Sequence, residues 1–142
     1  MNPKVLTITC FACLTASSPA VLAEGHSDAT RDAVMGHMRA VGQKDIDAYV
    51  AGYAEDGKIV TPSRVYAGRD EIREFASDWL AEFSGPDVAV EMQSMTFEGD
   101  TAIIVFSGET ADKIYELGVE TFVVSNGEIV TQTYVVDVTP KE

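Results

Sequence analysis

The stretch that decides the fold is GVETFVVSNGEIVTQTYVVD, from Gly118 to Asp137. Two runs rich in Val, Ile, Thr and aromatic residues flank Asn126-Gly127, and runs of this composition favour β-strands. Asn-Gly between two such runs is the strongest short-range signal for a β-hairpin. The sequence therefore predicts two long antiparallel strands joined by a tight turn.

Strand-like runs extend further toward the N-terminus from this hairpin. We expect four strands, at residues 88–98, 101–109, 113–125 and 128–138. Within the second strand, Ile104 and Phe106 alternate with Ile103 and Val105, so both of its faces are apolar. One face would pack on the helices, and the apolar side chains on the other face must be buried by something else. The simplest cover is another copy of the same sheet, so we expect a homodimer through the sheet.

The spacing of apolar residues changes to a helical period before residue 86. Ser27-Asp28 can cap a first helix that ends near Gly42, and Asp45 can cap a second helix. A third helix would open at Gly68-Arg69, with acidic residues in its first turn. The apolar positions of the three helices are Val34, Met38 and Val41, then Ile46, Tyr49, Val50 and Tyr53, then Ile72, Phe75, Trp79 and Phe83. This order predicts an α+β fold, with three N-terminal helices packed on a curved, mostly antiparallel sheet.

The first 23 residues have the pattern of a secretory signal peptide. Lys4 precedes an apolar run from Val5 to about Ala16, and small residues lead to Ala23. The alternative is a buried or membrane helix, but this run is shorter than the roughly 20 residues that a span needs. We therefore expect cleavage after Ala23, a single domain over residues 24–142, and a periplasmic or secreted protein with no membrane attachment after cleavage.

Composition excludes several classes of site and partner. Both cysteines, Cys10 and Cys13, lie in the expected signal peptide, so the mature chain would have no disulfide, no cysteine metal ligand and no cysteine nucleophile. With two histidines in the whole chain, no metal-ligand spacing is present. The net charge of −13 describes an acidic protein that repels nucleic acid and anionic lipid.

Three motifs are similar to those of the nuclear transport factor 2-like (NTF2-like) superfamily, in its SnoaL-like and ketosteroid-isomerase-like branches. They are Tyr-Ala-Glu-Asp at Tyr53–Asp56, Gly-Arg-x-x-Ile at Gly68–Ile72, and Asn-Gly-Glu-Ile at Asn126–Ile129. The resemblance covers roughly Val34 to Asp137 and implies a cone formed by helices in the hollow of a curved sheet. It implies a pocket for a small apolar or aromatic ligand, and no cofactor.

Comparison with the steroid-isomerase branch places particular residues in the cone. That branch has a tyrosine on the first helix, an aspartate before a proline on the first strand, and an aspartate on the penultimate strand. The matching positions here are His37, Thr61 and Glu120, and the last-strand positions that would line the pocket are Gln132, Tyr134 and Val136. Thr61 stands where the general base would be, and its hydroxyl cannot take a proton from carbon near neutral pH.

Two classes of function follow from this resemblance. The first is an exported small-molecule-binding protein with an apolar cone-shaped pocket, which the missing base favours. The second is a cofactor-free isomerase, dehydratase or hydrolase-like enzyme that uses His37 and Glu120 as an acid/base pair. Further aromatic residues would line the pocket or form ordinary core: Tyr49, Tyr53, Trp79, Tyr115 and Phe122.

Overall fold

The computed structural model describes the backbone of residues 19–142 and the side chains from Ser27 onward. Its elements follow the chain as α1 (Pro19–Gln43), α2 (Ile46–Ala51), β1 (Tyr53–Val60), β2 (Val65–Ala67), α3 (Gly68–Glu82), β3 (Ala89–Glu98), β4 (Thr101–Glu109), β5 (Lys113–Ser125) and β6 (Glu128–Pro140). The expected signal peptide lies mostly outside the described residues. The predicted α+β class is confirmed, and the four long strands follow the three helices as expected, but β1 and β2 lie between α2 and α3.

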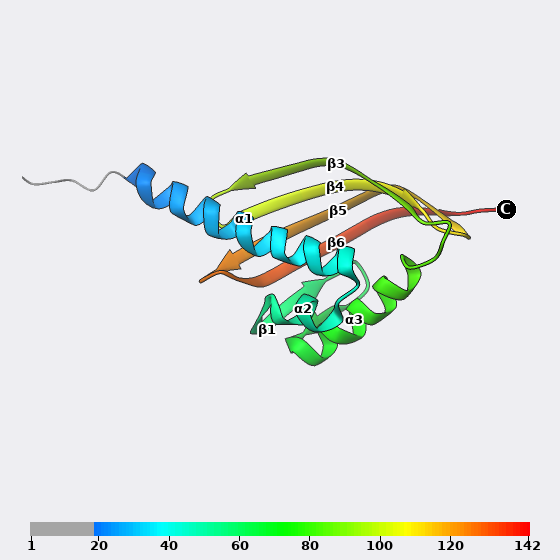
Figure 1. Cartoon of the computed structure of the whole chain (residues 1–142), viewed down its shortest axis with the longest axis horizontal. Coiled ribbons are helices and arrows are strands. Elements are labelled where there is room, and N and C mark those ends of the chain that lie inside the picture. Colours follow the sequence, from blue (N-terminus) through cyan, green and yellow to red (C-terminus); the bar gives the residue numbers. More distant parts are fainter. Residues whose placement is uncertain (1–18) are drawn as a thin grey trace, which may run out of the picture.

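One curved sheet carries the fold (Figure 1), with strand order β2-β1-β6-β5-β4-β3. Its strands pair antiparallel except for β1 and β6, which run parallel. Helix α1 lies across β3 to β6, and α2 and α3 lie beside β1 and β6. Long strands twist and coil, so they form a hollow that helices can fill. The three helices and the sheet thus make the cone that the sequence predicted.

The predicted hairpin at Asn126-Gly127 is confirmed. Both residues have positive φ, at 53° and 80°, as a two-residue type I′ turn requires. The turn sets the register of β5 and β6, so that Glu120 lies opposite Tyr134 and Phe122 opposite Gln132. All four of these side chains therefore share the concave face of the sheet.

Two predictions about the helices are wrong. Ser27 does not cap α1, which begins at Pro19; its hydroxyl instead accepts a hydrogen bond from Gly99 N at 3.1 Å, at the turn between β3 and β4. Tyr53 is not part of α2, which ends at Ala51, but starts β1. Asp45 does cap α2, because its Oδ1 accepts a hydrogen bond from Ala48 N at 2.9 Å.

The Gly-Arg-x-x-Ile motif joins the start of α3 to two strands. Gly68 has φ of +80°, and Arg69 donates hydrogen bonds from Nε and Nη2 to the carbonyl oxygen of Tyr53, at 3.0 and 2.6 Å. Nη2 also lies 3.3 Å from Glu128 at the start of β6. Ile72 is fully buried one turn later. The motif therefore fixes where α3 begins relative to β1 and β6.

A close approach inside the sheet needs glycine at position 118. In β5, Gly118 pairs with Phe106 of β4, and the Phe106 ring covers the place where a Cβ would lie. We predict that Gly118→Ala lowers the free energy of unfolding by about 1–3 kcal/mol, because the ring must move within a packed core. The control is Gly36→Ala in α1, where a Cβ meets open space. That change should stabilise by about 0.5–1 kcal/mol, since glycine weakens a helix interior.

Urea denaturation measures both changes. Equal stability of Gly118→Ala and the wild type would contradict this packing of Phe106.

Candidate functional site

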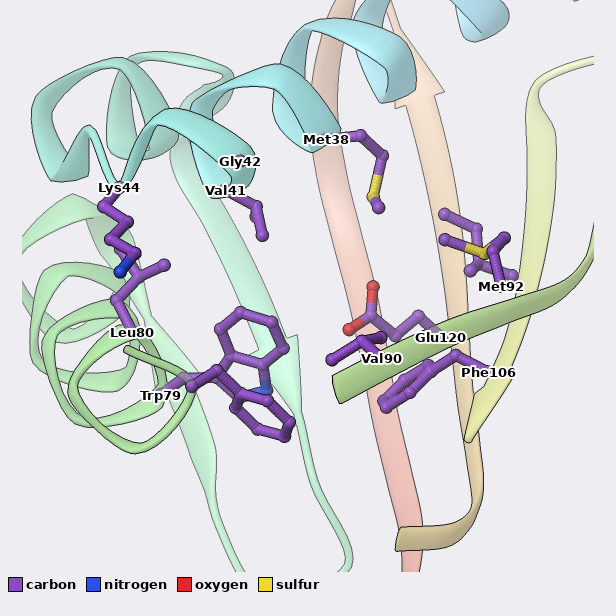
Figure 2. Close-up of a pocket in the computed structure, with 12 residues that line it drawn as sticks. Met38, Val41, Gly42, Lys44, Trp79, Leu80, Val90, Met92, Phe106 and Glu120 are labelled. Atoms are coloured by element: carbon purple, nitrogen blue, oxygen red, sulfur yellow. The ribbon is translucent and has the colours of Figure 1, made fainter. Parts of the chain in front are cut away.

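A cavity of about 250 Å³ lies inside the cone, between α1, α3 and the concave face of the sheet (Figure 2). Apolar side chains supply nearly all of its walls, and Glu120 is its one acidic group. The lining residues are Met38, Val41, Gly42, Lys44, Trp79, Leu80, Phe83, Val90, Met92, Ile104, Phe106 and Glu120.

Secondary-structure periodicity brings these walls together. Met38 and Val41 lie three residues apart on α1, so they share one side of the helix. Ile104 and Phe106 lie two residues apart on β4, so they share one face of the strand. Both are almost fully buried, at 1% and 4% exposure. The cavity is thus a gap in the apolar core, with Lys44 at its edge.

Glu120 lies on the concave face of β5, between Ile104 of β4 and Tyr134 of β6. Its carboxyl group points into the space between Met38 and Trp79 (Figure 2). Its side chain has no ion-pair partner among the described residues. An unpaired carboxylate in an apolar space is costly to ionise.

Burial accordingly raises the pKa of Glu120 from its ordinary value of 4.5 to about 7, and a hydrogen bond with Gln132 offsets part of that rise. Gln132 Oε1 in turn accepts hydrogen bonds from the hydroxyls of Tyr53 and Tyr49, the latter at 3.4 Å. Burial raises the pKa of both tyrosines, so they stay protonated. The carboxyl group is therefore the end of a buried chain of polar side chains.

His37 is also buried, but among aromatic rings. Its ring centroid lies 4.4 Å from that of Tyr49, 5.1 Å from that of Phe122 and 5.8 Å from that of Tyr53. Its Nδ1 has no hydrogen-bond partner, and burial lowers its pKa from 6.5 to about 3. Among the described contacts, no hydrogen bond or ion pair joins His37 to Glu120. Each of the two groups thus favours its own neutral form.

The other residues expected around one cavity lie in separate places. Trp79, like Glu120, lines the cone cavity. Four belong to the buried core or border it around His37: Tyr49, Tyr53, Phe122 and Gln132. Three line a groove between α3 and β6: Tyr115, Tyr134 and Val136.

Thr61 lines neither the cone cavity nor this groove. Its Oγ1 donates a hydrogen bond to the carbonyl oxygen of Arg64 at 2.9 Å and accepts one from Arg64 N at 3.0 Å. The hydroxyl closes the turn between β1 and β2. A threonine before a proline is therefore explained here by the turn.

The sequence comparison missed most residues that form the cavity wall. Val90 and Met92 sit on β3 at the sheet edge and are 50% and 40% exposed, and Leu80 is buried on α3. Nothing in their local pattern separates a cavity wall from ordinary core, since both need apolar side chains at the same spacing. The one available signal was a charged residue, Glu120, that alternates with Gly118, Phe122 and Val124 on one face of β5.

The described part of the chain has neither a metal-ligand cluster nor a membrane-spanning helix. Residues 19–142 contain no group of three or more His, Cys, Asp or Glu side chains arranged to hold a metal ion. Within the same residues, no helix has both the length and the apolar character needed to cross a membrane.

The protein is thus an α+β cone with an apolar cavity between its helices and its curved sheet. Comparison with known proteins gives its family. The sequence model of the SnoaL-like domain matches residues 34–132. The chain therefore belongs to the SnoaL-like domain family. A search of curated proteins found no match.

Solved structures share the same fold. An NTF2-like protein of unknown function from Burkholderia xenovorans LB400 is 22% identical, with a TM-score of 0.65 over 82% of this chain and 88% of that one. SalBIII, described as an epoxide hydrolase/cyclase-like enzyme in pyran ring formation, is 18% identical, with a TM-score of 0.66 over 80% and 97%. TerC, crystallised with polyporic acid, is 15% identical, with a TM-score of 0.63 over 77% and 92%. At these identities the likeness concerns the fold.

Glu120→Gln tests the protonation of the cavity. The folded pKa of Glu120 lies above its ordinary value, so the folded protein holds an extra proton between pH 4.5 and about 7. The free energy of unfolding therefore falls as pH rises through this window. Glutamine at position 120 cannot ionise, so this fall in the free energy of unfolding is absent in the variant. Between about pH 4.5 and pH 8, the variant should gain about 3 kcal/mol relative to the wild type.

His37 acts in the opposite direction, because its folded pKa lies below its ordinary value and its contribution is lost as pH falls from 6.5 toward 3. The two groups partly cancel in the wild type, whereas Glu120→Gln should show the acid-side loss from His37 alone. Urea denaturation over this pH range measures both effects. A stability difference between the two proteins that does not change with pH would contradict the raised pKa.

Proposed function

We propose that this protein binds a small, largely apolar molecule in the cone cavity. The observation that carries this proposal is an apolar space of about 250 Å³ with one carboxyl group, Glu120, in its wall. Pockets that bind small molecules are mostly apolar, with a few polar groups that orient the ligand. Two proteins of the same fold support this class of ligand: TerC was crystallised with polyporic acid, and SalBIII is described as an epoxide hydrolase/cyclase-like enzyme in pyran ring formation.

The protonation of Glu120 indicates which polar group a ligand would present to it. A carboxyl group with a pKa near 7 is largely protonated in mildly acidic solution and donates a hydrogen bond. A ligand with one acceptor, such as a carbonyl or ether oxygen, and an apolar body fits that donor and the surrounding walls. Lys44 at the edge of the cavity adds a charge near the entrance.

A second function is a cofactor-free isomerase, dehydratase or hydrolase-like enzyme. The observation that favours it is again the pKa of Glu120, because a general acid or base works best when its pKa is near the working pH. Glu120 would be the proton-transfer group. His37, which the sequence paired with it, has a pKa of about 3 and would stay neutral, so it would shape the site without carrying charge.

The N-terminal segment supports export. We propose that the protein acts in the periplasm or outside the cell, after loss of residues 1–23, because an apolar run and a small-residue cleavage context precede the domain.

Binding in the cone can be measured with N-phenyl-1-naphthylamine, an uncharged dye whose emission rises in apolar sites. We predict saturable binding at one site per chain. Met38→Trp should fill the cavity and weaken binding by roughly tenfold, the effect of losing a well-packed apolar contact. The matched control is Met35→Trp, one turn away on the same helix, where Met35 is 43% exposed.

Equal affinity of the dye for the two variants would place its site elsewhere and contradict the proposal. In a separate measurement, mass spectrometry of molecules that copurify with the wild type would identify the class of the natural ligand. If the wild type converts a copurified molecule and Glu120→Gln does not, while Glu120→Gln still binds the dye, the second function is supported.

We also propose that a second copy of the chain covers the convex face of the sheet. Ile103, Leu117 and Val135 are 40%, 44% and 49% exposed there, and in register Val105 lies opposite Val119, which lies opposite Val135. An exposed apolar patch on a sheet face is typical of a protein interface. A two-fold dimer buries the same patch on both copies.

Val135→Lys should place two like charges in that interface and convert a dimer to a monomer in sedimentation experiments at micromolar protein. Met35→Lys, at a similarly exposed position on α1, is the control and should leave the dimer intact. A wild-type chain that sediments as a monomer at all concentrations would contradict this interface.

A further inference from the structure

A second concave site lies between α3 and the C-terminal half of β6. It has a volume of about 370 Å³ and shares only Trp79 with the lining of the cone cavity. We call it the α3–β6 groove. Its lining residues are Tyr66, Phe75, Asp78, Trp79, Glu82, Lys113, Tyr115, Tyr134, Val136 and Val138. The groove exists because β1 pairs with β6 only as far as Thr133, which leaves this side of β6 without a neighbouring strand.

Five aromatic side chains line the groove, and three of them form a cluster of inclined rings. The centroids of Tyr66 and Phe75 are 5.2 Å apart with planes at 64°, and those of Phe75 and Tyr134 are 5.5 Å apart at 72°. All three rings also line the groove. Because ring faces carry negative potential, such a cluster attracts a cation that has apolar surface.

The structure already contains one contact of this kind at the edge of the groove. The guanidinium carbon of Arg64 lies 4.3 Å from the centroid of the Tyr66 ring. Arg64 is itself held by Glu74, at 2.9 Å. One face of the Tyr66 ring is therefore in cation–π contact with a side chain of this protein.

Acidic groups add charge to the groove. Asp78 and Glu82 lie one turn apart on α3 and both line it. Lys113 Nζ lies 2.5 Å from Glu82 Oε1, and the Tyr115 hydroxyl donates a hydrogen bond to the same oxygen. Asp78 has no ion-pair partner among the described residues. Lys113 is thus neutralised by Glu82, and Asp78 leaves the groove with excess negative charge.

The tyrosines in the groove keep their protons. Burial raises the pKa of Tyr115, with further contributions from its hydrogen bond to Glu82 and from the charge of that carboxylate. Burial also raises the pKa of Tyr134, and the charges of Glu120 and Glu82 add to it. Both rings therefore stay neutral, and both lie in a negative potential. The net charge of −13 extends that potential over the molecule.

We propose that the α3–β6 groove binds a small organic cation of the alkylated ammonium class. The ring faces contact the alkyl groups, and Asp78 supplies the opposite charge. An alkylated ammonium group fits because it combines positive charge with apolar surface and is recognised by aromatic rings in this way. The site shares the Trp79 side chain with the cone cavity, and its other lining residues differ from those of that cavity.

The test titrates the full chain with tetramethylammonium and choline, and with 3,3-dimethyl-1-butanol, the uncharged analogue of choline. Sodium chloride keeps the ionic strength constant. Calorimetry gives the affinity, and amide NMR shifts locate the site. We expect saturable binding of both cations, with the neutral analogue weaker by roughly tenfold. The shifts should concentrate at Tyr66, Lys113 and Tyr134.

Two variants and one control separate the contributions. Asp78→Asn should weaken cation binding several-fold, whereas Asp70→Asn, with the same change of charge in the first turn of α3, should leave it within experimental error. Lys113→Met removes a positive charge and leaves the Glu82 carboxylate without its ion-pair partner, so it should tighten cation binding. This opposite direction is not expected from a damaged fold.

Several results would overturn the proposal. Equal binding of the neutral analogue would show an apolar groove without selectivity for charge. Equal effects of Asp78→Asn and Asp70→Asn would show a response to net charge alone. Shifts confined to residues of the cone cavity, such as Val41 and Met92, would place the cation there. Absence of saturable binding would remove the site altogether.

Discussion

The helices cover only one face of a sheet whose strands alternate side chains between two faces. On the covered face, Ala102, Ile104 and Phe122 are at most 1% exposed, and on the open face Ile103 and Val135 remain 40% and 49% exposed. The cavity exists because the curved sheet and two straight helices cannot meet everywhere. The other face of the sheet stays open because no helix or strand among residues 19–142 covers it.

The helices that cover the concave face determine the pKa of Glu120, because they bury its carboxyl group. On the convex face it would be an ordinary solvated carboxylate. On the concave face it is 7% exposed, and burial raises its pKa to about 7. The hydroxyls of Tyr49 and Tyr53 donate hydrogen bonds to Gln132 Oε1, so the polar atoms of these three side chains have partners beside Glu120. One side chain in an apolar space can therefore serve a binding site or a proton-transfer site, and the ligand decides which.

Much of the fold could be predicted from local pattern. The four long strands, the hairpin turn and the start of α3 depend on composition, period and glycine at positive φ, which act within a few residues. The parallel pairing of β1 with β6 and the short strand β2 depend on contacts between segments far apart in the chain. The early start of α1 does too, because Ser27 bonds to the turn at Gly99 instead of capping a helix.

The sequence by itself determined the α+β class, the family, and the place of the Glu120 carboxyl group among the apolar residues of one face of β5. Only the tertiary structure decided that His37 lies among aromatic rings while Glu120 faces a cavity, although both are buried. It also decided that Tyr115, Tyr134 and Val136 line a separate groove. The physical reason is that periodicity assigns a residue to a face. Where two faces leave a gap depends on how helices and a curved sheet pack in three dimensions.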